Sequence, residues 1–164
     1  MANHEIITRV EKDKGGASVL TVIINNGFLH YALIGDAMLS IYRKGELFRI
    51  SKGHSIDEVA KKQYIDGKMQ KKEAVSVYKE KKLLYYLGQE SHKDSEMNDT
   101  PIKLQKGDIV VLMSKGIFKG IKWIKLEEIL AGKKTIEEIS NEIIASIQSN
   151  CNGSILLMKY KANK

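Results

Sequence analysis

An uninterrupted apolar run, Ile109–Met113, places the strongest constraint on how this sequence can fold. A short apolar run that is bounded by turn-forming residues predicts a strand buried on both faces. The polar segment Ser114-Lys115-Gly116 follows, and we expect it to be a turn, with apolar character returning at Ile117. Because a fold often displays functional side chains where a core strand ends, Lys115 is the first candidate functional residue.

Short runs rich in β-branched residues, separated by tight-turn signals, fill residues 17–50. Asn26-Gly27 is a strong hairpin signal, since both residues accept a positive φ at low cost. Gly35-Asp36 interrupts the pattern, and Lys44-Gly45 gives a further turn. We therefore expect an antiparallel meander of four strands, at Ala17–Asn25, Phe28–Ile34, Ala37–Tyr42 and Leu47–Ile50.

The remaining sequence alternates between helical periodicity and short strands. Helices are predicted over Ser51–Asp66, with Ser55 or Asp57 as N-cap, over Lys125–Ala131 and over Thr135–Gln148. Thr135 followed by Glu138 has the spacing of a capping box. Strands are expected at Ile102–Leu104 and Ser154–Tyr160. Without a repeat or linker, this order predicts one α+β domain over residues 1–164, built on antiparallel sheets.

Charge and composition exclude several classes of protein. The net charge is +7, but the lysines are spread along the chain, and no zinc-finger or RNA-binding motif accompanies them. A solvated lysine-rich surface explains that charge, so we expect no nucleic-acid partner. No apolar run approaches the roughly 20 residues that span a bilayer, so we expect no membrane partner. A single cysteine, Cys151, cannot form an internal disulfide, and we expect a cytoplasmic location.

The residues alone reveal no catalytic set. None of the four histidines pairs with a second metal ligand at a usual spacing, and no glycine-rich phosphate loop or nucleophile elbow occurs. Cys151 has no evident base to activate it. Of the turn aspartates, only Asp36, between two expected core strands, is placed for more than local hydrogen bonding.

Five short motifs, taken in order, carry a resemblance to a known family. They are Gly35-Asp36, Tyr42-Arg43-Lys44-Gly45, Gly53-His54-Ser55, Gly107-Asp108 and Ser114-Lys115-Gly116. Over residues 15–158 the series resembles the metal-dependent serine/threonine protein phosphatases of type 2C, the PPM family. The resemblance implies an antiparallel β-sandwich with helices on the outer faces. It also implies that the N-terminal strands and helix of the family are missing here.

The departures from the family pattern bear on function. Family members hold two Mg²⁺ or Mn²⁺ ions with aspartates, and two of those positions correspond here to Lys115 and Cys151. Hard divalent ions need carboxylate oxygens, so an ammonium group repels them and a thiol suits them poorly. The family-motif positions that are retained are Gly35, Asp36, His54, Ser55, Gly107, Asp108, Ser114, Gly116 and Asn152.

These departures predict a catalytically inactive phosphatase-like domain that acts by binding or regulation in signalling, with no catalytic residue, bound metal or other cofactor. The alternative is the C-terminal portion of an active Mg²⁺- or Mn²⁺-dependent phosphatase whose missing ligands lie in another segment or chain. Lys115 is a candidate phosphate contact, against the simpler reading of a solvated lysine. Because sheet edges would be uncovered, we expect self-association or a protein partner.

Overall fold

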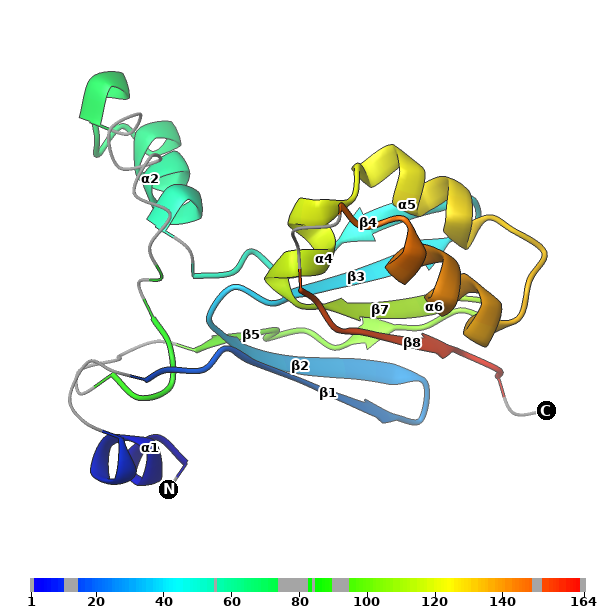
Figure 1. The fold of residues 1–164 in the computed structure, drawn as a ribbon, viewed down its shortest axis with the longest axis horizontal. Helices are drawn as coiled ribbons and strands as arrows, with labels where there is room; N and C mark the ends of the chain where they lie inside the picture. Colours follow the sequence, from blue (N-terminus) through cyan, green and yellow to red (C-terminus); the bar gives the residue numbers. More distant parts are fainter. Residues whose placement is uncertain are drawn as a thin grey trace. The chain divides into compact units, whose positions relative to one another are not determined.

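The computed structural model describes residues 2–10, 15–54, 56–73, 83, 85–89, 95–148 and 152–162 (Figure 1). The chain divides into two compact units. The first unit comprises Met1–Thr21, Ala32–Asp36 and Lys52–Met97, and the second unit comprises Val22–Tyr31, Ala37–Ser51 and Asn98–Lys164. A compact unit is not by itself an independently folding domain, so the single domain over residues 1–164 stays a prediction.

A four-stranded antiparallel sheet forms the centre of the second unit. Its order is β4-β3-β7-β8, and its strands are β3 (Met38–Arg43), β4 (Glu46–Arg49), β7 (Ile109–Met113) and β8 (Ile155–Lys159). Ile41 of β3 lies opposite Val110 of β7, which lies opposite Met158 of β8. Val110 and Val111 have no exposed surface, so the prediction that this run is a strand buried on both faces is confirmed.

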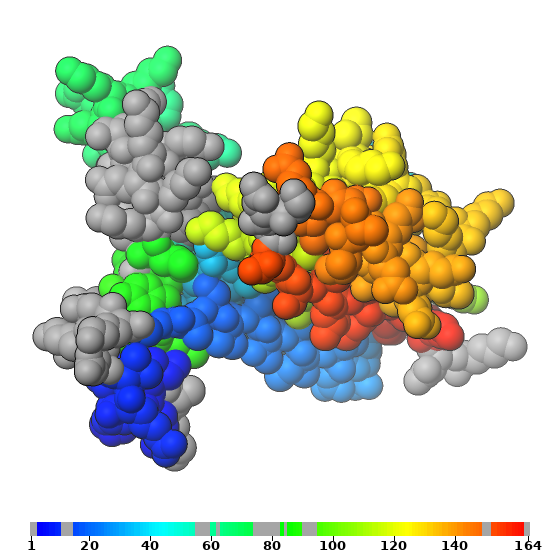
Figure 2. Space-filling model, viewed as in Figure 1, coloured from blue at the N-terminus to red at the C-terminus, as the bar shows by residue number. Residues whose placement is uncertain are grey.

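Three helices of the second unit pack on one face of this sheet. They are α4 (Lys115–Gly120), α5 (Trp123–Leu130) and α6 (Ile136–Ala145). The shared core joins Val111 and Met113 of β7 to apolar side chains on each helix, including Ile117, Leu126 and Ile143. Figure 2 shows α6 in orange lying against β8 in red. Full burial of each such side chain contributes about 1.5–3 kcal/mol, so this layer is a major source of stability.

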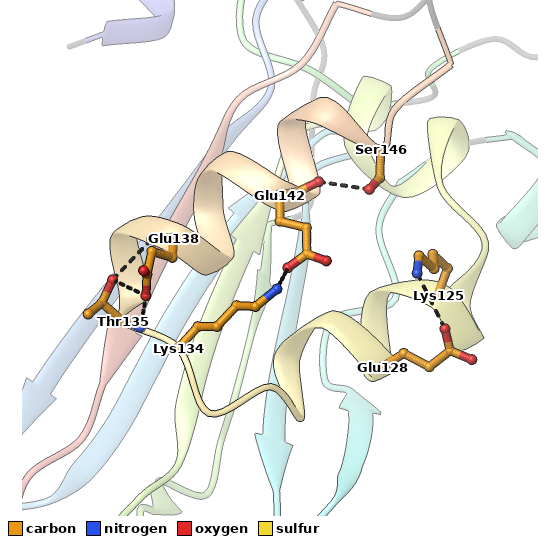
Figure 3. A network of polar contacts seen from close by, with 7 residues as sticks. All are labelled: Lys125, Glu128, Lys134, Thr135, Glu138, Glu142 and Ser146. Atoms are coloured by element: carbon orange, nitrogen blue, oxygen red, sulfur yellow. Dashed lines mark hydrogen bonds and ion pairs between the residues drawn. The ribbon is translucent and has the colours of Figure 1, made fainter.

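Local signals explain where the helix α6 begins. The Thr135 hydroxyl accepts a hydrogen bond from the Glu138 backbone N–H (3.2 Å), and the Glu138 carboxylate accepts one from the Thr135 N–H (2.7 Å) (Figure 3). This reciprocal arrangement is the predicted capping box. Lys134 also forms an ion pair with Glu142, eight residues further along the chain (2.6 Å). The predicted helix therefore forms, although it ends at Ala145 rather than Gln148.

The prediction of a polar turn at Ser114-Lys115-Gly116 is wrong. Lys115 is the first residue of α4, and Ser114 is the extended N-cap residue with ψ 165°. The physical reason is tertiary packing, because Ile117 and Gly120 are buried on one side of this short helix. Two glycines in six residues weaken the local helical signal, which is why the segment looked like a turn.

A second antiparallel sheet contains β1 (Val19–Asn25), β2 (Phe28–Ile34), β5 (Glu96–Met97) and β6 (Ile102–Lys103). β1 pairs with β2, and β5 and β6 both pair with the opposite side of β2. The Asn26-Gly27 hairpin is confirmed, with φ values of 49° and 78°, the conformation of a type I′ turn.

The predicted four-stranded meander over residues 17–50 is wrong at its midpoint. β2 and β3 belong to different sheets, and β3 pairs with β4 and β7 instead. Gly35, with φ 101°, ends β2, and a Cβ atom there would collide with Ser18. Gly35-Asp36 is therefore the point where the chain crosses from one sheet to the other. The alternation of apolar and polar residues along the sequence cannot distinguish such a crossing from a break within one sheet.

The described part of the first unit includes the helices α1 (Ala2–Arg9) and α2 (Ile56–Ile65). The Asn3 side chain joins α1 to a distant segment, because its oxygen accepts a hydrogen bond from Gly88 N–H (2.6 Å) and its amide donates to Gln89 O (3.2 Å). The helix predicted within Ser51–Asp66 is confirmed as α2. Of its two predicted N-caps, Ser55 lies outside the described residues, and Asp57 is wrong because it lies inside the helix, which begins at Ile56.

The predicted α+β class, built on antiparallel sheets, is confirmed. Among the helices of the described residues, none has the length and apolar character needed to span a bilayer.

Candidate functional site

The end of β7 meets the loop before β8 at a corner that two hydrogen bonds between Ser114 and Ser154 hold together. Ser114 N–H donates to Ser154 O (3.0 Å), and Ser154 N–H donates to Ser114 Oγ (2.9 Å). The Ser114 side chain makes no capping hydrogen bond to α4. Its hydroxyl instead fixes the start of β8, which gives this retained motif position a structural role.

Gly116 brings the start of α4 against the same loop. A Cβ atom at position 116 would overlap the carbonyl oxygen of Asn152, so only glycine allows this approach. Gly153 lies close to Ile117, because a Cβ atom at position 153 would be 2.8 Å from the Ile117 Cδ1 atom. The structure thus brings together Ser114, Gly116 and Asn152, three positions that lie on two motifs far apart in the sequence.

Lys115 lies at this corner, half-buried, as the first residue of α4. It therefore lies between the retained positions Ser114 and Gly116, where the resemblance implies an aspartate. Cys151, the other altered position, lies outside the described residues. Within the described ranges, no group of three or more His, Cys, Asp or Glu side chains could hold a metal ion. The residues described at this corner therefore do not fit a pair of Mg²⁺ or Mn²⁺ ions.

The first unit assembles two further motifs. Asp36, which is 9% exposed, accepts a hydrogen bond from Ser18 Oγ at its Oδ1 atom (3.0 Å), and its own N–H donates back to Ser18 Oγ (3.2 Å). The sequence reasoning did not predict this contact of Ser18, although the hairpin register indicates that Ser18 lies near Asp36. A two-residue turn that places Asn25 opposite Phe28 also places Ser18 opposite Gly35.

His54 forms two hydrogen bonds with Gly35, the residue before Asp36. Its N–H donates to Gly35 O (2.7 Å), and Gly35 N–H donates to His54 Nδ1 (3.2 Å). Nδ1 therefore acts as an acceptor, and in the neutral ring the proton lies on Nε2. The ring also meets Tyr85 edge to face, with centroids 5.5 Å apart. The motifs that contain Gly35 and His54 are thus in direct contact, while Ser55 is among the residues not described.

Glu96 is a second residue that sequence reasoning missed. Its carboxylate accepts hydrogen bonds from the backbone N–H groups of Lys52 (2.8 and 3.0 Å) and Gly53 (2.8 Å). It fixes the segment that leads to His54. The interaction joins positions 43 and 44 residues apart, and no local pattern signals it.

Asp108 and Arg43 of the second unit form an ion pair in which Asp108 is buried and Arg43 is partly exposed. Arg43 Nε donates to Oδ1 of Asp108 (2.9 Å) and its Nη2 donates to Oδ2 (2.6 Å), while Gln105 N–H also donates to Oδ2 (2.7 Å). The hydrogen bonds that Arg43 donates to Asp108, and then the charge of that carboxylate, raise the pKa of Arg43 above its ordinary value. Both carboxylate oxygens of Asp108 are therefore engaged within the chain. Gly107 supports the turn with φ 95° and donates to Tyr160 O (3.0 Å).

Comparison with solved structures identifies the fold. The serine/threonine phosphatase of S. agalactiae matches with a TM-score of 0.82 at 21% identity, over 98% of this chain and 66% of that one. PstP/Ppp of Mycobacterium tuberculosis matches with a TM-score of 0.77 at 20% identity, over 97% and 68%. Stp1 of Staphylococcus aureus gives 0.74 at 15% identity, over 98% and 62%.

The chain has the fold of the PPM-type serine/threonine phosphatases. The resemblance that the motifs carried, and the fold class that it implied, are confirmed. No protein-family model and no curated protein matches the sequence. The chain spans about two thirds of the length of the phosphatase chains that it matches. At these identities the PPM-type likeness establishes fold, and activity has to be argued from the residues of the site.

Proposed function

We propose that this chain is a catalytically inactive phosphatase-like domain that acts by binding or regulation in signalling. The observation that carries the proposal is Lys115, which takes the place of a carboxylate at the corner between β7 and β8. The ammonium group brings a positive charge to the position where, by the family resemblance, a divalent cation would be held. Two unit charges about 4 Å apart interact by about 1 kcal/mol even in bulk water. Because the lysine ammonium and a metal cation are both positive, this interaction is a repulsion.

The retained Asp108 supports the same proposal. Asp108 is 2% exposed, and both of its oxygens are held by Arg43 and Gln105. Releasing Asp108 to a metal would leave the Arg43 guanidinium without its buried partner, at a cost of several kcal/mol. Asp108 is therefore a structural residue.

A second candidate function is a portion of an active metal-dependent phosphatase whose remaining ligands come from another segment or chain. The observation in its favour is the high structural similarity to solved phosphatase chains. This chain covers 66% of the S. agalactiae phosphatase chain. On that reading Mg²⁺ or Mn²⁺ would be the cofactor, and Lys115 would have to move away from the bound ion.

Hydrolysis of a phosphothreonine peptide in the presence of Mn²⁺ tests both candidates. The inactive domain should release no more phosphate with Mn²⁺ than with Mn²⁺ and a chelator together. Turnover that requires Mn²⁺ and stops on addition of the chelator would support the active portion and overturn the proposal.

Binding of a phosphoryl group by Lys115 is a separable part of the proposal, since lysine binds phosphate as a point charge. The Lys115→Ala variant should lose at least about tenfold in affinity for a phosphopeptide, which corresponds to about 1.4 kcal/mol, in a calorimetric titration. Lys119→Ala is the matched control, because Lys119 is an exposed lysine on the same helix. Equal affinities for the two variants and the unaltered chain would rule out this contact.

A further inference from the structure

The sheet edges of this protein differ in how they are protected. β4 carries the charged residues Glu46 and Arg49, and its Leu47 N–H is capped by the Glu127 carboxylate (2.8 Å). β8 ends in Lys159. On the far side of β2, the two-residue strands β5 and β6 each contain a charged residue. Charges, short strands and side-chain caps of this kind prevent a sheet from recruiting another strand.

The outer edge of β1 has none of these protections. β1 is seven residues long, its sequence VLTVIIN contains no charged residue and no proline, and it ends the strand order of its sheet (Figure 1). No strand in the described part of the chain pairs with that edge. Long, uncharged edges rich in β-branched residues are the ones that pair with another strand.

The hairpin turn fixes which backbone groups face outward. In a two-residue type I′ hairpin, Asn25 and Phe28 form a hydrogen-bonded pair, and alternate residues of β1 then point their backbone groups to either side. The N–H and C=O groups of Leu20, Val22 and Ile24 therefore point toward the open edge. The hairpin also carries exposed apolar side chains: Val19 (39% exposed) and Ile23 (62%) lie on β1, and Phe28 (40%) lies on β2.

We propose that the outer edge of β1 pairs with β1 of a second copy of this chain, antiparallel about a two-fold axis at Val22. This register places Leu20 opposite Ile24 and Thr21 opposite Ile23, and it joins two sheets into one. It specifies the binding surface within the proposed binding function and does not depend on the absence of catalysis.

The uncharged sequence of β1 favours an identical, uncharged strand over a charged partner strand. The chain has a net charge of +7, yet none of its 27 lysine and arginine residues lies in β1. Two copies can therefore pair here without placing like charges directly opposite each other, an arrangement that destabilises strand pairs. An acidic strand would find no cation in β1 to pair with. A strand that is self-complementary about a two-fold axis also gives a closed dimer rather than a filament.

Two double variants test the pairing and its register in the full chain. Thr21 and Ile23 are exposed, so charges at these positions leave the core intact. Thr21→Lys with Ile23→Lys places like charges opposite each other in the dimer and should raise its dissociation constant about tenfold or more in sedimentation equilibrium. Thr21→Lys with Ile23→Glu places opposite charges there and should bind at least about tenfold more tightly than the double-lysine variant.

Amide hydrogen exchange supplies an independent measurement on the unaltered chain. Protection of Leu20, Val22 and Ile24 should rise with protein concentration, while that of Leu47, which already donates to Glu127, should not change. A chain that stays monomeric at all concentrations, a dimer that the double-lysine variant leaves intact, or one that the lysine–glutamate pair fails to restore would overturn the proposal. None of these outcomes bears on the phosphopeptide hydrolysis assay, so the two proposals fail separately.

Discussion

Gly116 is the residue whose replacement probes the corner between β7 and β8 most directly. Alanine in place of glycine normally stabilises a helix by up to about 1 kcal/mol. Here the added Cβ would overlap the carbonyl oxygen of Asn152. We expect Gly116→Ala to lower the free energy of unfolding by about 1–3 kcal/mol, measured by urea denaturation.

Gly132→Ala is the control for that variant, because its Cβ would lie 3.1 Å from Ile129 O, a contact that a small shift relieves. Its effect should be smaller than that of Gly116→Ala. If Gly116→Ala proved neutral or stabilising, the loop at Asn152 would not pack against α4 as described.

The Arg43–Asp108 pair is a second residue-scale test. Arg43→Ala would leave the Asp108 carboxylate, which is 2% exposed, without its guanidinium partner. We expect a loss of about 3 kcal/mol in unfolding free energy. Arg43→Lys should lose less unfolding free energy, since lysine keeps the charge but not the bidentate hydrogen bonding of arginine. In a double-mutant cycle, Arg43→Ala with Asp108→Ala should cost less than the sum of the single changes, and additivity would contradict the pair.

At the scale of single elements, the capping box of α6 predicts a pH-dependent stability. Hydrogen bonds from the Thr135 backbone and side chain lower the pKa of Glu138 from its ordinary value. The folded-state pKa therefore lies below the unfolded value of about 4.3. The stabilisation is fully present above that unfolded pKa and is lost as the pH falls through the folded one.

Comparison with Glu138→Gln isolates this effect, because glutamine keeps an acceptor but cannot titrate. The unaltered chain should be the more stable of the two at neutral pH, and the difference should shrink as the pH falls below the unfolded pKa of about 4.3 in urea melts. A difference that does not change with pH would contradict the account. Thr135→Ala should cost about 1 kcal/mol at neutral pH.

Elements defined by local signals could be predicted from the sequence. The Asn26-Gly27 hairpin and the Thr135 cap each depend on residues a few positions apart, and both formed as expected. The helix α4 could not be predicted, because its stability comes from burying Ile117 in a core that other elements supply. The sheet assignment of β3 failed for a related reason, since its partner β7 lies far along the chain.

On the scale of the whole molecule, the order of motifs predicted the fold at identities of only 15–21% to the phosphatases compared. Glycines at 35, 107 and 116 are tied to backbone conformation or close approach, so they mark the fold even where other side chains have changed. The contacts of Asp108 with Arg43 and of Glu96 with Lys52 were not predictable, because they join residues 65 and 44 positions apart.

The net charge of the whole chain makes a prediction for the dimer through β1. Two copies with a charge of +7 each repel one another, and salt screens that repulsion. The dissociation constant should therefore fall as salt rises from about 50 mM to about 300 mM, in sedimentation equilibrium at pH 7. Weaker association at higher salt would indicate an interface held by opposite charges, contrary to pairing through the uncharged β1 strand.

A Mn²⁺ titration tests most directly the proposal that Lys115 prevents this phosphatase-like fold from holding a divalent metal. The unaltered chain should bind Mn²⁺ no more tightly than about 1 mM, the level of a weak surface contact, in calorimetry or electron paramagnetic resonance. Lys115→Asp should tighten binding by at least about tenfold, because it replaces a repelling charge with a carboxylate ligand. Lys119→Asp, the same charge change on the same helix, should have a smaller effect. Micromolar Mn²⁺ binding by the unaltered chain would contradict the account.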